Sequence, residues 1–273
     1  MQDDEAFMDK AFWWVAAAVV IVIAAAGYYY YRTHSKAPPP TVRQISPPVE
    51  SSNEPAIRHP IPDSGLGPNE AAQPPLAESD GPVRDALAGI VGGKTVAEFL
   101  IPQNIVRHIV VTVDNLPRKK VAVELRPIKP TGGKTVTSGA EDALTLNPDN
   151  YARYAPLVTL VQSTDAKQLT RVYFHFYPLF QEAYENLGYP SQYFNDRLVE
   201  VIDDFLKAPD VKGPIELVQP RVFYEFKDRN LEARSAGQKL LIRMGSANAA
   251  VIKAKLREIR EEVVSHEKAR SKP

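Results

Sequence analysis

From about residue 82 onward, apolar side chains recur every three or four residues, a spacing that places them on one face of a helix. Capping residues, glycines and prolines interrupt this pattern and set the expected ends of each helix. The predicted helices are, in chain order, residues 83–91, residues 104–113, a helix opened by Asn147-Pro148, a helix from the cap Ser163-Thr164-Asp165 to Gly188 with a kink at Pro178, a helix between a Ser191 cap and Pro209, and two helices separated at Met244-Gly245-Ser246.

The strand signals are short by comparison. Residues 135–137 and 144–146 have the composition of a hairpin across Ser138-Gly139, and residues 222–226 resemble a short β segment. The sequence therefore predicts a mainly α domain with small β-hairpin and extended elements.

A different pattern occupies the N-terminal region, where residues 11–31 form an uncharged run of twenty-one residues. A helix of that length spans about 30 Å, the thickness of the hydrocarbon core of a bilayer. Trp13 and Trp14 lie at one end and four tyrosines, residues 28–31, lie at the other, where amphipathic rings favour the headgroup level. We expect a single transmembrane helix that contacts the lipid bilayer through residues 11–31.

The alternative interpretation of this run is a cleaved signal peptide, because Ala24-Ala25-Ala26-Gly27 resembles a cleavage site. A signal peptide begins with a positive region, whereas residues 1–10 carry four acidic side chains and Lys10 alone. We therefore expect an uncleaved anchor. Its orientation stays open: Arg32, Lys36 and Arg43 favour a cytoplasmic C-terminal part, but a long exported chain often departs from so small a bias.

Residues 37–80 differ sharply from both regions, since they contain eleven prolines and almost no periodic apolar residues. Such a segment cannot bury enough apolar surface to offset its ordering entropy, so we expect a disordered, extended linker. The predicted organisation is a leader and anchor at residues 1–36, a linker at residues 37–80 and a mainly α domain at residues 81–268.

Composition narrows the functional classes. The chain has 273 residues, of which 33 are basic and 33 are acidic, and this balance gives no reason to expect nucleic acid as a partner. Cysteine is absent, which excludes disulfides, thiol catalysis and cysteine metal sites. We expect neither a metal site nor a cofactor.

Two motifs invite a catalytic interpretation and are better explained otherwise. Asp196, Glu200, Asp203 and Asp204 fall opposite the apolar face of their predicted helix, so we expect them to be a solvated face. Gly92-Gly93-Lys94-Thr95 and Gly132-Gly133-Lys134-Thr135 resemble the end of a phosphate-binding loop, but each lacks the earlier glycine that the motif requires.

Basic side chains concentrate in one stretch, residues 118–134, with Glu124 as the single acidic residue there. Pro117, Pro127 and Pro130 favour exposed, non-helical chain in this stretch. A solvated loop is one interpretation, and an anion- or partner-binding patch is the other. The residues of the predicted patch are Arg118, Lys119, Lys120, Arg126 and Lys129.

Several longer stretches of the chain have a distinctive sequence. They are residues 99–120 (FLIPQNIVRHIVVTVDNLPRKK), 150–158 (NYARYAPLV), 177–190 (YPLFQEAYENLGYP), 193–203 (YFNDRLVEVID), 213–226 (GPIELVQPRVFYEF) and 235–245 (SAGQKLLIRMG). Through these stretches the chain resembles the proteobacterial family known as domain of unknown function 3014. The resemblance implies a bacterial inner-membrane protein with a periplasmic domain, and it carries over no activity and no binding residues.

These observations favour a membrane-anchored envelope protein whose domain is a non-enzymatic binding module. Its expected partner is another envelope protein or an anionic lipid or polymer, within reach of a long tether. The alternative is an enzyme that acts on an envelope polymer, with Glu182 or Asp196 as acid or base. A deep polar cleft would favour the enzyme, and a shallow apolar or basic patch would favour the binding module.

Overall fold

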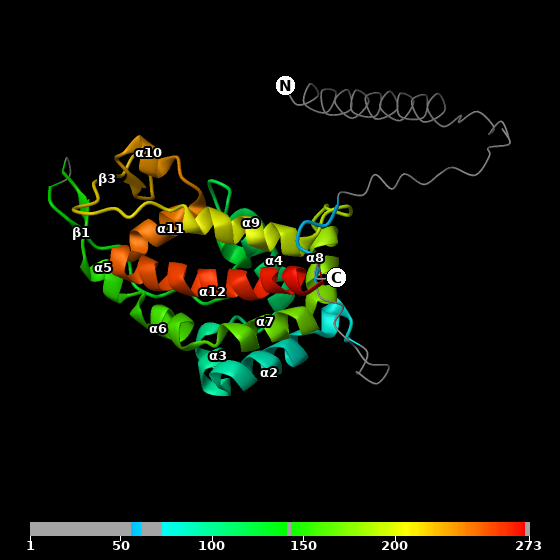
Figure 1. Cartoon of the computed structure of the whole chain (residues 1–273). Helices are drawn as coiled ribbons and strands as arrows, with labels where there is room; N and C mark the ends of the chain where they lie inside the picture. The colour runs from blue at the N-terminus through cyan, green and yellow to red at the C-terminus, as the bar shows by residue number, and fades with distance from the viewer. Residues whose placement is uncertain (1–55, 62–72, 141–142, 271–273) are drawn as a thin grey trace, which may run out of the picture. The chain divides into compact units, whose positions relative to one another are not determined.

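A computed structural model of the chain describes residues 56–61, 73–140 and 143–270. Within these ranges the protein is mainly helical, with two small antiparallel strand pairs (Figure 1). The 3-10 turns are η1 (Leu76–Glu78) and η2 (Val123–Leu125), and the strands are β1 (Thr137–Ser138), β2 (Thr145–Leu146), β3 (Leu217–Val218) and β4 (Glu225–Phe226). The helices are α2 (Asp80–Val91), α3 (Gly93–Phe99), α4 (Ile105–Asn115), α5 (Asp149–Ala152), α6 (Ala155–Ser163), α7 (Ala166–His175), α8 (Tyr177–Asn186), α9 (Phe194–Leu206), α10 (Arg229–Glu232), α11 (Ala236–Met244) and α12 (Ser246–Arg270).

The largest part of the core is aromatic and lies where α2, α4, α8 and the start of α9 meet. Phe180 and Phe194 stack with ring centroids 5.7 Å apart, and Tyr184 packs against Phe194 at the same distance. Rings of this size bury large apolar areas and dominate core energetics. Phe174, Phe176 and Phe180 are buried and Tyr173 and Tyr177 are half-buried, so the aromatic residues between positions 173 and 180 belong mostly to the core.

The long helix α12 packs against four other helices, α6, α7, α9 and α11. In Figure 1 it crosses the middle of the view, with α6 and α7 on one side and α9 and α11 on the other. Two of its lysines cap the C-terminal ends of neighbouring helices: Lys253 Nζ donates to the carbonyl of Ala208, after α9, and Lys255 Nζ donates to the carbonyl of Thr164, after α6. A cation at these ends satisfies orphan carbonyls and complements the helix dipole.

The strand pairs form a second region with its own small core. Leu146, Ile215, Leu217 and Phe226 are buried there beside Ile242 of α11. The guanidinium of Arg243 lies 4.5 Å from the ring centroid of Phe226, a cation–π contact. The two strand pairs are therefore attached to the helical part of the protein mainly through their contacts with α11.

Most predicted helices are confirmed, and their ends follow local chemistry. Asp165 caps α7 by accepting a hydrogen bond from Gln168 N, and the predicted kink is a break at Phe176, after which Pro178 stands in the first turn of α8. The break between α11 and α12 falls at Gly245, whose φ of 84° and close approach to the Tyr151 ring leave no space for a Cβ atom.

One predicted helix start is wrong, and one helix of the structure was not predicted. The Ser191 cap is wrong: α9 begins at Phe194, and the free N–H of Phe194 is accepted by Gln181 Oε1 of α8 instead, 2.9 Å away. The helix α3 was not predicted, because seven residues after a Gly-Gly pair give too short a periodic pattern.

The predicted linker is partly visible. Leu76 is 7% exposed within the aromatic core, and residues 56–61 contact the start of α9. Residues 56–61 and Leu76, which the sequence assigns to a disordered, extended linker, therefore pack on the domain. The rest of the predicted linker lies outside the described residues.

The predicted anchor, residues 11–31, also lies outside the described residues. Among the helices of the described ranges, none has both the length and the apolar composition needed to cross a membrane.

Candidate functional site

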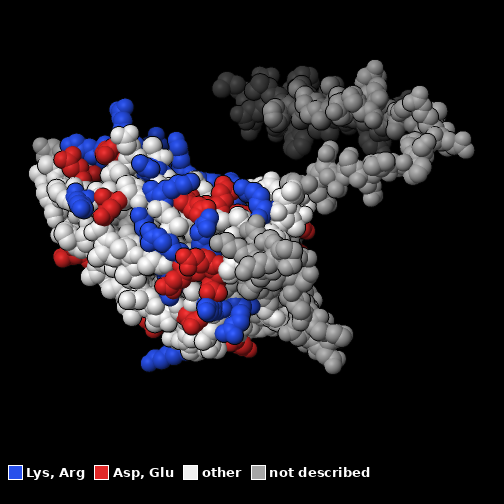
Figure 2. All heavy atoms as spheres, in the orientation of Figure 1, with Lys and Arg blue, Asp and Glu red and all other residues white. Residues whose placement is uncertain are grey.

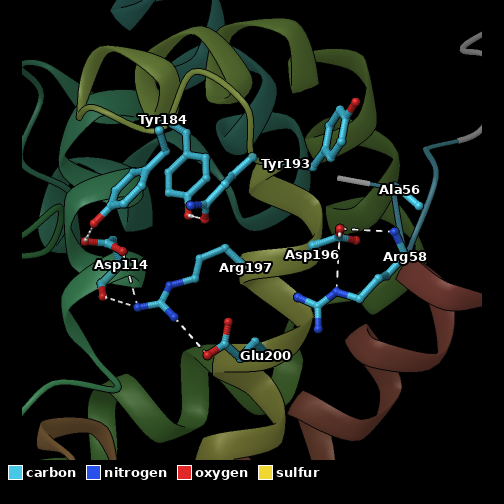
Figure 3. Close-up of a pocket in the computed structure, with 10 residues that line it drawn as sticks. Ala56, Arg58, Asp114, Tyr184, Tyr193, Asp196, Arg197 and Glu200 are labelled. Atoms are coloured by element: carbon cyan, nitrogen blue, oxygen red, sulfur yellow. Dashed lines mark hydrogen bonds and ion pairs between the residues drawn. The ribbon is translucent and has the colours of Figure 1, made fainter. Parts of the chain in front are cut away.

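A pocket of about 420 Å³ opens where the end of α4, the loop after α8 and the first turns of α9 meet (Figure 3). Tyrosines and charged side chains form its wall, and a short segment from the predicted linker forms part of its rim. The residues that line it are Ala56, Arg58, Asp114, Tyr184, Tyr189, Gln192, Tyr193, Asp196, Arg197 and Glu200.

A network of ion pairs connects α4 to α9 across this pocket. Asp114 is 4% exposed, and its carboxylate accepts hydrogen bonds from Arg118 Nη2 at 2.6 Å and lies 3.2 Å from Arg197 Nη2. Arg197 also pairs with Glu200 at 3.0 Å, so its guanidinium lies between two carboxylates, as Figure 3 shows. The attraction of two cationic partners offsets the free-energy cost of removing the Asp114 carboxylate from water, so this network can connect the two helices.

The network and the burial shift two pKa values. Burial opposes the charge of Arg197, but the hydrogen bond that it donates to Glu200 and the charges of Glu200 and Asp114 raise its pKa overall. Burial raises the pKa of Tyr184 to about 12. Arg197 therefore stays charged and Tyr184 stays protonated throughout the physiological range.

On the other side of the pocket, α9 holds residues 56–61 by their main chain. The carboxylate of Asp196 accepts from the backbone N–H of Arg58 at 3.1 Å and of His59 at 2.7 Å. The amide of Asn195 donates to the carbonyl of His59 at 2.8 Å. Figure 3 shows Asp196 directed toward the segment that carries Ala56 and Arg58. We call Asn195 and Asp196 the backbone clamp.

Neighbouring helices position the backbone clamp. Tyr173 of α7 donates from its hydroxyl to Asn195 Oδ1 at 2.9 Å, which directs the amide nitrogen of Asn195 toward the segment. Burial raises the pKa of Tyr173 well above its usual value of 10, so the hydroxyl keeps the proton that it donates. Asp196 stands in the first turn of α9, where the helix dipole stabilises a negative charge.

The arrangement favours recognition over acid–base chemistry. Asp114 and Glu200 are paired with arginines, and Asp196 accepts two backbone N–H groups, so each pocket carboxylate already has a partner. A general base must instead be free to approach the proton that it removes. Within the described ranges, no group of three or more His, Asp or Glu side chains is arranged to hold a metal ion.

The predicted solvated face of α9 is corrected by these contacts. Glu200 is exposed as expected, but Asp196 is 8% exposed because residues 56–61 cover it. Asp203 pairs with Arg260 of α12 at 2.6 Å, and Asp204 accepts from Ser235 and Gln238 of α11. Glu182, named for the alternative enzyme, is exposed on α8 and does not line the pocket.

The residues of the predicted anion-binding patch have different surroundings. Arg118 joins the pocket network through Asp114 and also donates to the hydroxyl of Tyr189 at 2.8 Å. Lys129 donates to the carbonyl of Ala97 at 2.7 Å, and Arg126 is half-buried with no described hydrogen-bond partner for its Nε atom. Lys119 and Lys120 are exposed. The patch stays a prediction, carried by Lys119 and Lys120, since the other members have partners or are partly buried.

The loop at Gly132-Gly133-Lys134 has the opposite polarity to a phosphate-binding loop. Its carbonyl oxygens converge on the guanidinium of Arg153, which donates to Gly132, Gly133 and Lys134 at 2.7–3.0 Å. A phosphate-binding loop presents backbone N–H groups instead. The loop therefore binds a cation from its own chain.

Sequence reasoning missed Asp114, Tyr173, Asn195 and Arg197. The spacing of Arg197 and Glu200 is a local signal for an ion pair on one helix face, and Asp114 and Arg118 are four residues apart, although Arg118 lies beyond the end of α4. The contacts that build the site are different in kind, because Arg197 pairs with a residue 83 positions earlier and Asp196 with residues more than 130 positions earlier.

Comparison with known families places this geometry in context. The model of the family described as "Protein of unknown function (DUF3014)" matches residues 105–260, more than half of the chain, so the chain belongs to that family. No curated protein and no solved structure matches the chain. The matched region contains Asp114 and the backbone clamp, whereas residues 56–61 precede it.

Proposed function

We propose that this member of the DUF3014 family is a membrane-anchored, non-enzymatic binding module of the bacterial envelope. The observation that carries the proposal is the state of the pocket carboxylates, each of which already pairs with an arginine or with backbone N–H groups. Groups in this state can orient a bound partner, but they are poorly placed to transfer protons to a substrate.

The membrane part of the proposal rests on the sequence. The uncharged run at residues 11–31, with aromatic residues at both ends, supports a single-pass anchor in the inner membrane. The family resemblance supports a periplasmic domain. A tethered module meets its partner at high effective concentration, so a modest affinity is sufficient.

The surface of the domain offers contact sites of two kinds. On the face shown in Figure 2, basic and acidic side chains are interspersed, so a partner would not be attracted by one extended field. Val222 and Phe223, between β3 and β4, are 78% and 80% exposed and form an apolar tip. Lys119 and Lys120 offer an exposed cationic site for an anionic lipid, protein or polymer.

Photocrosslinking in intact cells tests the proposal. A photoreactive residue in place of Gln192, an exposed residue at the rim of the pocket, should give a discrete adduct with one or a few envelope proteins. The same residue in place of Gln162, exposed on α6 and outside the pocket, is the matched control and should give no such adduct.

Two further measurements test the membrane anchor and separate binding from catalysis. The full-length protein should stay in the membrane pellet after alkaline carbonate washing. A folded Glu200→Gln protein should complement a deletion phenotype, because an amide can still accept a hydrogen bond from Arg197. Loss of complementation with an unchanged Gln192 adduct would instead indicate chemistry at Glu200.

A further inference from the structure

We propose that the backbone clamp is a binding site for a short peptide segment that bends where it is bound, which residues 56–61 occupy in cis and a segment of a partner protein occupies in exchange. This inference rests on the proposed function, since it names the kind of partner that the module binds. Peptide binding by the clamp is nevertheless measurable without knowing the natural partner.

The clamp contacts the main chain. Asp196 accepts from two consecutive backbone N–H groups, and Asn195 donates to the carbonyl that follows them. Main-chain atoms are present in every peptide, so these three hydrogen bonds select little by sequence; they require the chain to bend, as it does at Arg58 and His59, so that two consecutive N–H groups reach one carboxylate. Asp196 Oδ2 also lies 3.8 Å from Arg58 Nε, which favours a cationic side chain at the first of the two N–H positions.

The clamp is built by the domain and does not depend on the segment. Asn195 and Asp196 both stand at the start of α9, which packs on the aromatic core through Phe194. The hydroxyl that orients Asn195 comes from Tyr173 of α7. Departure of residues 56–61 would therefore leave the two side chains in place and leave the carboxylate of Asp196 without its two donors, which another peptide can supply.

The segment itself is held lightly. Ala56, Ile57 and Arg58 are exposed, with Ile57 at 44%, and residues 59–61 are half-buried. The segment thus has no fully buried apolar side chain to hold it, and its hydrogen bonds to the clamp contribute to its attachment. The adjoining pocket of about 420 Å³, with Ala56 and Arg58 at its rim, offers space for a longer peptide to continue along α9.

The family comparison agrees with an exchangeable occupant. Asn195 and Asp196 lie inside the matched region, residues 105–260, whereas residues 56–61 lie outside it. The receptor half of this contact therefore belongs to the part of the chain that defines the family, and the occupant does not.

The test uses the full-length protein in detergent and a fluorescent synthetic peptide with the sequence of residues 53–64, NEPAIRHPIPDS. In an open variant, residues 56–61 are replaced by six Gly and Ser residues. We expect fluorescence anisotropy to show binding to the open variant and at least tenfold weaker binding to the wild type, whose clamp is occupied.

The decisive control changes only the peptide. N-methylation of the backbone nitrogens of Arg58 and His59 removes both donors to Asp196 and should weaken binding to the open variant at least tenfold. A peptide with Arg58→Ala should lose less than the methylated peptide. Because the protein is the same in these arms, their result does not depend on whether a clamp variant folds.

Variants of the clamp complete the design. In the open variant, Asn195→Ala with Asp196→Asn should abolish peptide binding, while Asp85→Ala, an exposed carboxylate of α2, should leave it unchanged. Equal binding of methylated and unmethylated peptides, or no binding to the open variant at millimolar peptide, would overturn the inference. Failure of the proposed function differs from both, since it removes the Gln192 adduct in cells and leaves peptide binding intact.

Discussion

The two ends of α9 use the same chemistry for different purposes. Near its start, Asp196 accepts from the N–H groups of Arg58 and His59. Near its end, Asp204 accepts from the hydroxyl of Ser235 at 2.5 Å and from the amide of Gln238 at 2.7 Å. Each carboxylate therefore joins α9 to a distant part of the chain through two donors.

What differs is the apolar surface that surrounds each contact. The donors to Asp204 belong to the start of α11, a helix that buries Leu241, Ile242 and Met244. The donors to Asp196 belong to a segment whose described side chains are exposed or half-buried. Hydrogen bonds define the geometry in both places, but buried apolar area decides whether the contact is permanent.

The largest effect should come from breaking the permanent contact. Asp204→Ala leaves the amide of Gln238, which is 5% exposed, and the hydroxyl of Ser235 without their acceptor. We expect a loss of about 2–3 kcal/mol in the free energy of unfolding, since buried unsatisfied groups cost roughly 1–3 kcal/mol each. Thermal unfolding should show a midpoint lower by roughly 4–12 °C. Glu200→Ala, on the exposed face of the same helix, is the control and should change stability by no more than about 0.5 kcal/mol.

A second substitution tests the packing between α9 and α11. A Cβ atom at Gly237 would lie 2.4 Å from Cε2 of Phe205, so Gly237→Ala should force the ring to move and cost about 2 kcal/mol. The matched control is Gly89→Ala in α2, where a Cβ atom meets nothing within 4 Å. That change should stabilise the protein by about 0.5–1 kcal/mol through helix propensity. The same sign for both substitutions would contradict the assigned packing.

Alkaline pH should lower the free energy of unfolding through Tyr184 of α8, which packs against Phe194 at the start of α9. Its pKa is raised to about 12 by burial, so the folded state keeps a proton that the unfolded state releases near pH 10. The stability that this group contributes is present below pH 10 and is lost as pH rises toward 12, by on the order of 1 kcal/mol at pH 11. Chemical denaturation between pH 9 and 11 should show a smaller decline for Tyr184→Phe than for the wild type. Parallel curves would contradict this role.

Asp196→Ala should change global stability less, by about 1 kcal/mol or below, because it releases a segment with little buried area. Its effect should be local: limited trypsin digestion should cleave after Arg58 faster, and hydrogen exchange at residues 58 and 59 should accelerate. Asp204→Ala should show the reverse, with a lower midpoint and unchanged cleavage after Arg58 at temperatures well below it. Coincident changes in both variants would remove the distinction between the two ends.

The smallest effect on stability is expected at the predicted anion-binding patch. Lys119→Glu with Lys120→Glu should alter the free energy of unfolding by no more than about 0.5 kcal/mol, since both side chains are exposed. Sedimentation with anionic liposomes should fall relative to the wild type at low salt, and the difference should vanish near 1 M salt, where the Debye length is ~3 Å. Arg118 is left unchanged because it pairs with buried Asp114. Equal sedimentation of both proteins at low salt would exclude the patch.

The helices could largely be predicted from sequence because the interactions that start and end them are local. The cap at Asp165, the proline in the first turn of α8 and the glycine between α11 and α12 each act within a few residues of the feature that they cause. The start of α9 was misplaced for the opposite reason: its cap comes from Gln181, thirteen residues earlier on another helix.

The same distinction explains the candidate site. Periodicity by itself determined which side of α9 is polar and placed Asp196 there, since that depends only on the 3.6-residue repeat. Tertiary structure alone decided that this polar side is covered by α11, α12 and residues 56–61. The face of a helix on which a carboxylate lies follows from its spacing to neighbouring residues. Its exposure depends instead on which segments pack against it, and for Asp196 these come from more than 130 residues away in the sequence. No local sequence pattern contains that information.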